Sequence, residues 1–315
     1  MFPILSTCQS DLGFAFVAQT GDMQPGASGN QLEPVISCPL VNQGLVSNSG
    51  AGSCSNTAAS QLVGNPTALS SSYDGDTMYI LSAGFSETSI FACSIVDGDL
   101  ESCSKVNVST DGAYLENLVV SNDSLFLFDG TSSMFVCQLD DKKEVDTKDA
   151  TVPCTTWVNT NITSVDGMAT YGMATLYYLY DASNAAIFVC ELEASGFQSC
   201  RLAGNIESDN NVSNSYFLTG LAVTEKTAYI ATSDSIWSCK IEPSTGVFEE
   251  CKAIENEEVV NPQRIVVSSD GKKLYVPNGT GLNVVVCDVS ESESLENCTP
   301  SGPMSVTGAI ALLYA

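Results

Sequence analysis

The 315-residue sequence contains no histidine. In this chain, that absence excludes the Ser-His-Asp and Cys-His arrangements of nucleophilic catalysis, and it excludes metal sites that depend on an imidazole ligand. Lysine and arginine are also scarce, with 11 of them against 37 acidic residues and a formal net charge of −26. Nucleic acids and anionic membranes both require a positive patch, so this charge argues against either as a partner.

Long apolar segments are absent as well. No run reaches the roughly 18 apolar residues of a transmembrane helix, so we expect no insertion into a membrane. Residues 1–8 have neither a basic start nor a long apolar stretch, so they do not form a signal peptide, and the numbering is expected to describe a mature chain. The acidic residues are spread along the chain, which favours a solvated surface over a dedicated cation site.

Cysteine, in contrast, is abundant and regularly spaced. Twelve of the 13 cysteines form pairs in which a cysteine on a short apolar segment is followed by a second about one hairpin later. Successive first members lie 55, 44, 53, 49 and 48 residues apart, a period in the range of propeller blades. Adjacency predicts the disulfides Cys38–Cys54, Cys93–Cys103, Cys137–Cys154, Cys190–Cys200, Cys239–Cys251 and Cys287–Cys298.

The cysteines also indicate a compartment. Zinc ligation is excluded, because the chain has no histidine and no C-x-x-C spacing. Paired cysteines are natural in an oxidising environment, so we expect a secreted protein, extracellular or at the cell surface. Cys8 has no partner in this scheme and is either a free thiol or an intermolecular bridge. Sequons predict a glycoprotein, with candidate sites at Asn107, Asn122, Asn161, Asn211, Asn278 and Asn297.

Each repeat combines turn signals with short alternating strands. In the clearest copy, Asp270-Gly271 and Asn278-Gly279 form tight turns around the strand 273–276, and the cysteine strand 284–289 follows. Within the cysteine strands, apolar residues and cysteine alternate with period two, so that the cysteine faces a neighbouring sheet. A further apolar segment precedes each copy, which gives four strands per repeat and no helical periodicity.

These features predict an all-β fold, a six-bladed β-propeller of four-stranded antiparallel blades with one hairpin disulfide per blade. The chain, 1–315, is expected to form a single domain. Its approximate repeats cover 1–54, 55–103, 104–154, 155–200, 201–251 and 252–298.

Both ends of the chain carry a candidate innermost strand, although a closed ring needs only one of them. Residues 3–6 align with the inner segment 68–70, and 308–315 is another apolar stretch. In one alternative a terminal strand closes the ring, and the other end packs at its edge. In the other alternative, the spare strand pairs with a neighbouring molecule and builds an array. Residues 299–315 are accordingly a ring-closing strand in the first alternative or a donated strand in the second.

The segment 270–278, DGKKLYVPN, resembles the DG-x-x-LYV-x-N repeat of the YVTN-type, lactonase-like propellers, and the cysteine pairs resemble those of secreted variants. The resemblance implies the propeller fold. It says little about function, because the motif residues are blade scaffolding. Lactonases of this type that use a histidine base are excluded.

Candidate ligand residues lie beside the predicted innermost strands, since propellers usually bind ligands at the mouth of the central channel. They are Glu116, Asn117, Asp166 and Arg264. Carboxylate and amide oxygens suit Ca²⁺, so these residues could hold a calcium ion. The simpler expectation is that the protein binds no cofactor.

Scaffold residues repeat along the chain, whereas no polar or aromatic cluster does. The leading hypothesis is therefore a non-enzymatic structural or protein-interaction module, such as a subunit of an extracellular assembly or filament, with protein partners or other copies of itself. One alternative is a lactonase-like or Ca²⁺-dependent hydrolase with its site at the central channel. Another is a glycan-binding propeller lectin, with Trp157 as a candidate sugar platform.

Overall fold

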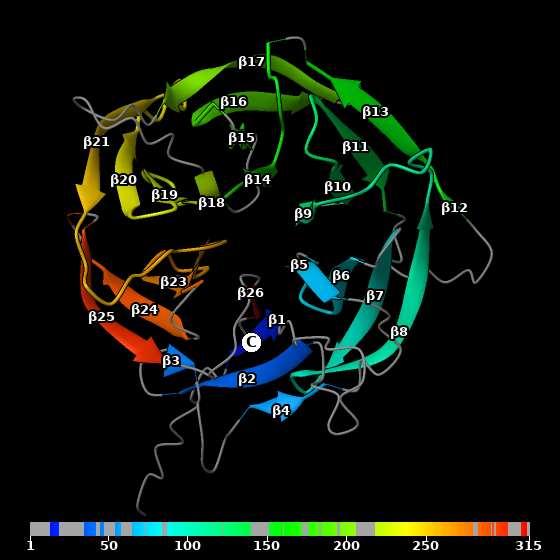
Figure 1. Ribbon diagram of the computed structural model, residues 1–315, viewed down its shortest axis with the longest axis horizontal. Helices are drawn as coiled ribbons and strands as arrows, with labels where there is room; N and C mark the ends of the chain where they lie inside the picture. The colour runs from blue at the N-terminus through cyan, green and yellow to red at the C-terminus, as the bar shows by residue number, and fades with distance from the viewer. Residues whose placement is uncertain are drawn as a thin grey trace, which may run out of the picture.

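The computed structural model describes residues 13–18, 35–41, 45–46, 54–57, 65–72, 74–83, 87–121, 123–139, 151–159, 161–171, 176–182, 184–193, 196–205, 218–279, 283–290, 292, 294–301 and 310–313. Their regular structure consists of β-strands, grouped into small sheets that surround a central axis (Figure 1). This arrangement is a β-propeller, as the sequence predicted. None of these residues belongs to a helix that could cross a membrane.

Within the described residues, the strands of the first three sheets follow one another from the channel outward. From its innermost strand, the first sheet contains β26 (Ile310–Leu313), β1 (Phe14–Ala18), β2 (Val35–Val41) and β3 (Leu45–Val46), and β4 (Ser55–Asn56) also pairs with β2. The second contains β5 (Asn65–Ser71), β6 (Thr77–Ala83), β7 (Thr88–Val96), β8 (Asp99–Val108) and β12 (Thr151–Val152). The third contains β9 (Asn117–Ser121), β10 (Ser124–Phe128), β11 (Ser133–Gln138) and β13 (Cys154–Val158).

Each of the other three sheets has four strands among the described residues. The fourth contains β14 (Gly167–Ala169), β15 (Leu176–Asp181), β16 (Ala186–Glu193) and β17 (Gly196–Asn205). The fifth contains β18 (Leu218–Val223), β19 (Thr227–Thr232), β20 (Ile236–Ile241) and β21 (Phe248–Ile254). The sixth contains β22 (Val266–Val267), β23 (Lys273–Pro277), β24 (Val284–Val289) and β25 (Leu295–Ser301).

Strands from the two ends of the sequence meet in the first sheet. β26 pairs antiparallel with β1, with Phe14 opposite Leu313 and Val17 opposite Ile310. β26 is therefore the innermost strand of this sheet, and β1 is the second. The other candidate inner strand, residues 3–6, lies outside the described residues.

Apolar cores lie between neighbouring sheets. In one of them, Ala222 and Tyr229 of the fifth sheet pack with Leu274 and Cys287 of the sixth. The period-two alternation of the cysteine strands produces this packing, because it turns every second side chain toward the next sheet. The first cysteine of each pair is fully buried, as the alternation predicted: Cys38, Cys93, Cys137, Cys190, Cys239 and Cys287.

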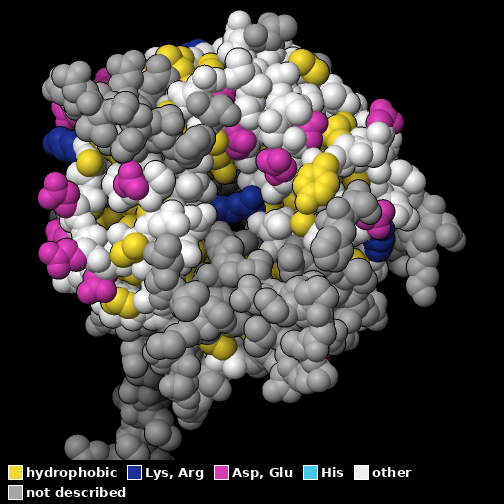
Figure 2. Space-filling model, viewed as in Figure 1, with side chains coloured by type: hydrophobic (Ala, Val, Ile, Leu, Met, Phe, Trp, Pro, Cys, Tyr) yellow, Lys and Arg dark blue, Asp and Glu magenta, His cyan; other side chains and the backbone are white. Residues whose placement is uncertain are grey.

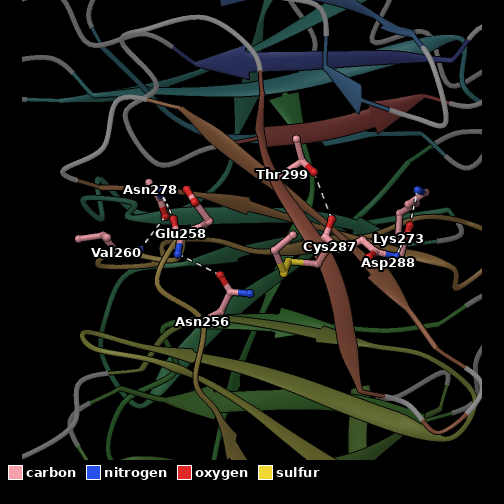
Figure 3. Close-up of a disulfide and its surroundings, with 10 residues drawn as sticks. Asn256, Glu258, Val260, Lys273, Asn278, Cys287, Asp288 and Thr299 are labelled. Carbon is pink, nitrogen blue, oxygen red and sulfur yellow. Dashed lines mark hydrogen bonds and ion pairs between the residues drawn. A yellow bond between two sulfur atoms is a disulfide. The ribbon is translucent and has the colours of Figure 1, made fainter.

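The chain holds six disulfides, and they join the pairs expected from adjacency. The one at Cys287 appears in Figure 3. The paired Cα atoms lie 4.0 to 4.1 Å apart, as expected for residues on adjacent outer strands. Six such bridges suit an oxidising environment, either extracellular or periplasmic.

The hairpins that carry the disulfides are less regular than the sequence predicted. In four of them the register shifts at the cysteine pair, and the residue before the second cysteine has a positive φ. None of these residues is a glycine, so no turn signal revealed them. They are Ser102 (φ 49°), Ser199 (φ 51°), Glu250 (φ 48°) and Asn297 (φ 48°).

The second sheet departs from the predicted four strands. Its outermost strand, β12, comes from the third repeat and pairs parallel with the end of β8, with Thr151 opposite Asn107. The backbone N–H of Ser109 also donates to the carbonyl oxygen of Val152 at 3.2 Å. The third repeat therefore covers the outer edge of the second sheet.

Side chains also connect three of the outer hairpins to the sheet before them. In three places, a donor from one sheet binds a carbonyl oxygen on the C-terminal hairpin of the next, which ties neighbouring sheets at the rim. The bonds run from Ser37 Oγ to Gly98 O, from Trp157 Nε1 to Phe197 O (3.0 Å) and from Arg201 Nε to Thr245 O (3.1 Å).

Candidate functional site

The central channel is lined by the innermost strands β5, β9, β14, β18, β22 and β26 (Figure 1). It encloses about 640 Å³. Its walls are largely aliphatic, whereas polar residues lie where the inner strands begin and end. In Figure 2, basic side-chain atoms lie at the central opening, and Arg264 is the one basic residue among the described lining residues.

All four predicted channel residues lie at the starts of inner strands. Glu116 and Asn117 lie at the start of β9, Asp166 directly precedes β14, and Arg264 lies two residues before β22. Hydrogen bonds connect these positions with Thr67 near the start of β5, so one end of the channel brings them together. We call this end the channel mouth.

Arg264 spans the channel mouth. Its guanidinium donates to the backbone carbonyl oxygen of Thr67, and its Nη2 donates to that of Glu116 at 3.0 Å. These contacts join the sixth sheet to the second and the third. Burial lowers the pKa of Arg264, while the nearby Tyr180 and Glu116 act in the opposite direction. An arginine retains its charge under such a shift, because its ordinary pKa lies far above neutrality.

Other carbonyl oxygens near the mouth also accept bonds from side chains of the preceding sheet. The Nδ2 of Asn117 donates to the carbonyl oxygen of Asp166 at 3.0 Å. The Oγ1 of Thr219 donates to that of Pro262 at 2.6 Å. Sequence reasoning missed Thr219, although it has the signal that selected Asn117, a polar residue just before an apolar inner segment.

The Asp166 carboxylate is held by its own sheet. Its Oδ2 accepts bonds from Ser164 Oγ at 2.9 Å and from the backbone N–H of Ala182 at 2.7 Å. Burial raises the pKa of Asp166, and the nearby Asp181 raises it further, which outweighs those two bonds. Asp166 thus combines a raised pKa with a position beside the channel.

Tyr180 was not predicted to belong to this site, yet it lines the channel next to these residues. Burial raises the pKa of Tyr180, and Arg264 and Asn117 oppose that shift. The phenol is therefore a neutral hydroxyl at physiological pH. A Cβ on Gly167 would lie 2.6 Å from the Tyr180 hydroxyl oxygen, so glycine is required for this close approach.

Among the described residues, the channel mouth does not bring together the ligands that a calcium ion needs. Ca²⁺ needs six to eight oxygen ligands, and several of them are usually carboxylates. The described residues contain no group of three or more Asp, Glu, His or Cys side chains that could hold a metal. Glu116 is exposed, Asp166 is engaged by Ser164 and Ala182, and the Arg264 guanidinium lies beside Glu116.

Comparisons with known proteins identify the fold. No protein-family model matches the sequence, and no curated protein matches it. A periplasmic gluconolactonase of Pseudomonas aeruginosa is similar in structure, with 12% identity, coverage of 96% of this chain and 99% of that one, and a TM-score of 0.65. The chain is a β-propeller. The propeller in a nidogen–laminin complex is 13% identical over 96% and 98% of the two chains, with a TM-score of 0.67. A putative 6-phosphogluconolactonase of Bacteroides uniformis is 16% identical, with coverage of 93% of this chain and 84% of that one and a TM-score of 0.63.

The identities are far too low to transfer an activity, so they establish the fold alone. The structural similarities agree with the resemblance of segment 270–278 to lactonase-like propellers. That resemblance also concerns residues that build the blades and not residues of a functional site. The neighbours of this propeller include both enzymes and a protein-binding module. The function must therefore be argued from the residues of this chain.

The predicted glycosylation sites differ in their surroundings. Asn161 and Asn297 are exposed, and Asn107 is half-buried. Asn122 and Asn211 lie outside the described residues, as does Cys8. Asn278 is only 3% exposed. Its Nδ2 donates to the carbonyl oxygen of Glu258 at 2.8 Å, and its Oδ1 accepts from the backbone N–H of Val260 at 3.0 Å (Figure 3).

A glycan on Nδ2 would break these bonds, so the surroundings of Asn278 are those of a structural residue, and its glycosylation stays a prediction. Trp157, the candidate sugar platform, is half-buried. Its ring packs edge-on against Phe197 with centroids 5.6 Å apart, and its Nε1 is bonded to the carbonyl oxygen of the same residue. It ties the third sheet to the fourth.

Proposed function

We propose that this protein is a secreted, six-bladed, disulfide-stapled propeller that acts as a non-enzymatic protein-interaction module. The observation that carries the proposal is the use of the polar groups at the channel mouth. The Arg264 guanidinium binds the carbonyl oxygens of Thr67 and Glu116, and the Asn117 amide binds that of Asp166. Groups that could orient a small ligand are thus engaged in holding the sheets together.

Two further observations support an interaction role. Disulfides in every repeat stabilise a rigid surface and persist in an oxidising environment. A similar propeller, that of nidogen, has been crystallised in a complex with laminin. A propeller offers a broad, stiff surface, which lowers the entropic cost of binding a protein partner.

The test is to isolate the chain from its native extracellular material without denaturation or reduction, and to measure the size and composition of the species that contain it. The proposal expects a stable complex, either with other proteins or with further copies. It also expects the purified chain to show no saturable hydrolysis of gluconolactone or 6-phosphogluconolactone. A monomer that hydrolyses either lactone would overturn the proposal.

A lactonase-like hydrolase is the second candidate, and one observation favours it. Asp166 directly precedes the inner strand β14 and lies close to Tyr180, and burial raises its pKa, as is common for a general base. In such a reaction Asp166 would take a proton from water as the water oxygen bonds to the lactone carbonyl carbon. Collapse of the tetrahedral species would break the ring C–O bond, and the proton would pass to the departing oxygen.

This candidate is tested with Asp166→Asn and with Asp234→Asn as the matched control, since Asp234 is an exposed turn residue of the fifth sheet. A hydrolase would lose about 100-fold or more in kcat/KM with the first variant and remain unchanged with the second. Equal activity in both variants would exclude Asp166 as the base.

A further inference from the structure

The outer edge of β13 differs from the outer edges of the second, fourth, fifth and sixth sheets. β13 is the terminal strand of the third sheet, and no described strand pairs with its outer side. Its sequence, CTTWV, contains no charged residue and is rich in residues that favour strands. Thr155, Thr156 and Val158 are exposed, and Val158 is 58% exposed.

Pro153 explains why this strand is regular. In four other hairpins the residue before the second cysteine has a φ near +50°, and the register shifts there. Proline fixes φ near −65°, so the third repeat cannot form that irregularity. Cys137 lies directly opposite Cys154, and the pairing of β11 with β13 continues without a shift to Ser133 and Val158.

The outer edges of the second, fourth, fifth and sixth sheets have features that prevent strand addition. The end of β8 is covered by β12. β17 is bulged and carries Arg201, and β21 is bulged and carries three charged residues within seven. β25 is bulged and contains Pro300. Charges, bulges and prolines are the usual means by which proteins block edge pairing, and β13 has none of these within the strand.

The register identifies the backbone groups that face outward. The Cα atoms of Cys137 and Cys154 are 4.0 Å apart, which corresponds to a non-hydrogen-bonded pair. Bonding alternates along an antiparallel pair, so Thr155 and Trp157 direct their backbone groups toward β11. Cys154, Thr156 and Val158 direct theirs away from the sheet, where a further strand could bind them.

Charge decides which partner suits this edge. Copies of a chain with a net charge of −26 repel one another, and this repulsion is smallest where the facing surfaces carry no acids. A two-fold contact also requires a patch that complements itself. If two β13 strands pair antiparallel about Thr156, then Thr156 faces Thr156 and Cys154 faces Val158. Each of these facing pairs exchanges both of its backbone hydrogen bonds.

We propose that β13 is a self-association edge, and that two copies of this protein join their third sheets into one continuous sheet through antiparallel β13 pairing. The proposal rests on the interaction role proposed above and names the partner, a second copy of the chain. Joining edges in this way satisfies backbone groups that otherwise bind water, and it places the Thr156 side chains side by side, a favourable cross-strand pair.

The test is sedimentation equilibrium of the oxidised full-length chain over a concentration series. The wild-type chain is expected to dimerise reversibly. Thr156→Pro removes an outward N–H without removing a bond to β11, and Thr156→Lys places like charges opposite each other across the pair. Each variant should raise the dimer dissociation constant at least about tenfold. The control is Thr299→Lys, which makes the same charge change at an exposed threonine of β25.

Hydrogen exchange on the wild-type chain provides a second readout that does not depend on a variant. The Thr156 and Val158 amides should become protected as the protein concentration rises. The proposal is overturned if the wild-type chain is monomeric at every concentration, or if it dimerises equally well with Thr156→Pro. A monomer that occurs in native complexes with a different protein would overturn this proposal and leave the interaction role intact.

Discussion

The guanidinium of Arg264 donates to the backbone carbonyl oxygen of Thr67, which lies 197 residues earlier in the chain. The same side chain donates to the carbonyl oxygen of Glu116, so one residue of the sixth sheet binds the second and third sheets across the channel. Contacts between neighbouring sheets hold a propeller together around its circumference. Arg264 adds a connection across the axis, which resists opening of the ring at its mouth.

Replacement of Arg264 by methionine should therefore destabilise the fold. Arg264→Met keeps an unbranched side chain but removes the donors, which leaves two carbonyl oxygens without these partners. Bonds to charged donors contribute about 1.5–3 kcal/mol each, so the loss of both should lower the free energy of unfolding by about 3–6 kcal/mol, measured by urea denaturation. Lys226→Met, at an exposed turn residue, is the control. Equal stability of the two variants would show that the cross-channel bonds contribute little.

Asn278 should behave as a structural residue. Asn278→Ala leaves the carbonyl oxygen of Glu258 and the N–H of Val260 without their partner inside the sixth sheet. Hydrogen bonds contribute about 0.5–1.5 kcal/mol each, so we expect a loss of about 1–3 kcal/mol in the free energy of unfolding. Asn161→Ala, at an exposed turn, should change it by less than about 0.5 kcal/mol.

The same contrast should appear in glycan occupancy. When the chain is secreted from a host that modifies sequons, peptide mass spectrometry should find glycan on Asn161 and none on Asn278, because folding buries the Asn278 amide. Occupied Asn278 in folded material would contradict the structural role of its hydrogen bonds. Unmodified Asn161 would show that exposure alone does not decide occupancy in this chain.

Much of the fold follows from the sequence, because its strongest signals are periodic. The cysteine spacing predicted a propeller, and the alternation around Cys93 and Cys287 predicted which face is buried. Such features depend on a few residues close in sequence. The blade count of six stays a proposal, although the described strands form six sheets.

Features that depend on distant partners could not be read in the same way. Nothing in Thr151-Val152 indicates that it pairs with β8 of the preceding repeat, and nothing in Trp157 distinguishes a sugar platform from a bond to the next sheet. The four channel residues were found because each stands beside an apolar inner segment. Their role was not found, since the donor of a hydrogen bond and its carbonyl acceptor lie up to 197 residues apart.

Removal of one disulfide should weaken the propeller without changing its fold. The Cys93–Cys103 bridge spans 10 residues, and a loop of that size contributes about 3 kcal/mol by the chain-entropy estimate. The double variant Cys93→Ser/Cys103→Ser should lose about 2–3 kcal/mol in the free energy of unfolding, measured under oxidising conditions. A circular dichroism spectrum like that of the wild type would confirm that the fold is kept. If the urea concentration at the midpoint of unfolding is the same for the double variant and the wild type, then the bridge contributes nothing to stability.

Asp181 should set part of the acid sensitivity of the fold. Burial raises the pKa of this carboxyl, but hydrogen bonds from Thr163, Asn184 and Ser164 outweigh burial, and the pKa is lowered from its ordinary value of 3.8. A lowered pKa in the folded state contributes stability that is fully present above 3.8 and is lost as the pH falls through the folded value. Asp166 has the opposite sign, because its raised pKa favours the folded state most at low pH and this contribution is lost as the pH rises.

The two carboxyls can therefore be separated by urea denaturation between about pH 2 and pH 7. Asp181→Asn should be less stable than the wild type at neutral pH, and the difference should shrink as the pH falls below 3.8, because the wild-type carboxyl is then protonated as well. Asp166→Asn should show the opposite trend. Its free energy of unfolding should increase relative to that of the wild type as the pH rises. If the stability of Asp181→Asn follows the wild-type curve in parallel over the whole range, then the hydrogen bonds from Thr163 and Asn184 do not favour the ionised carboxylate.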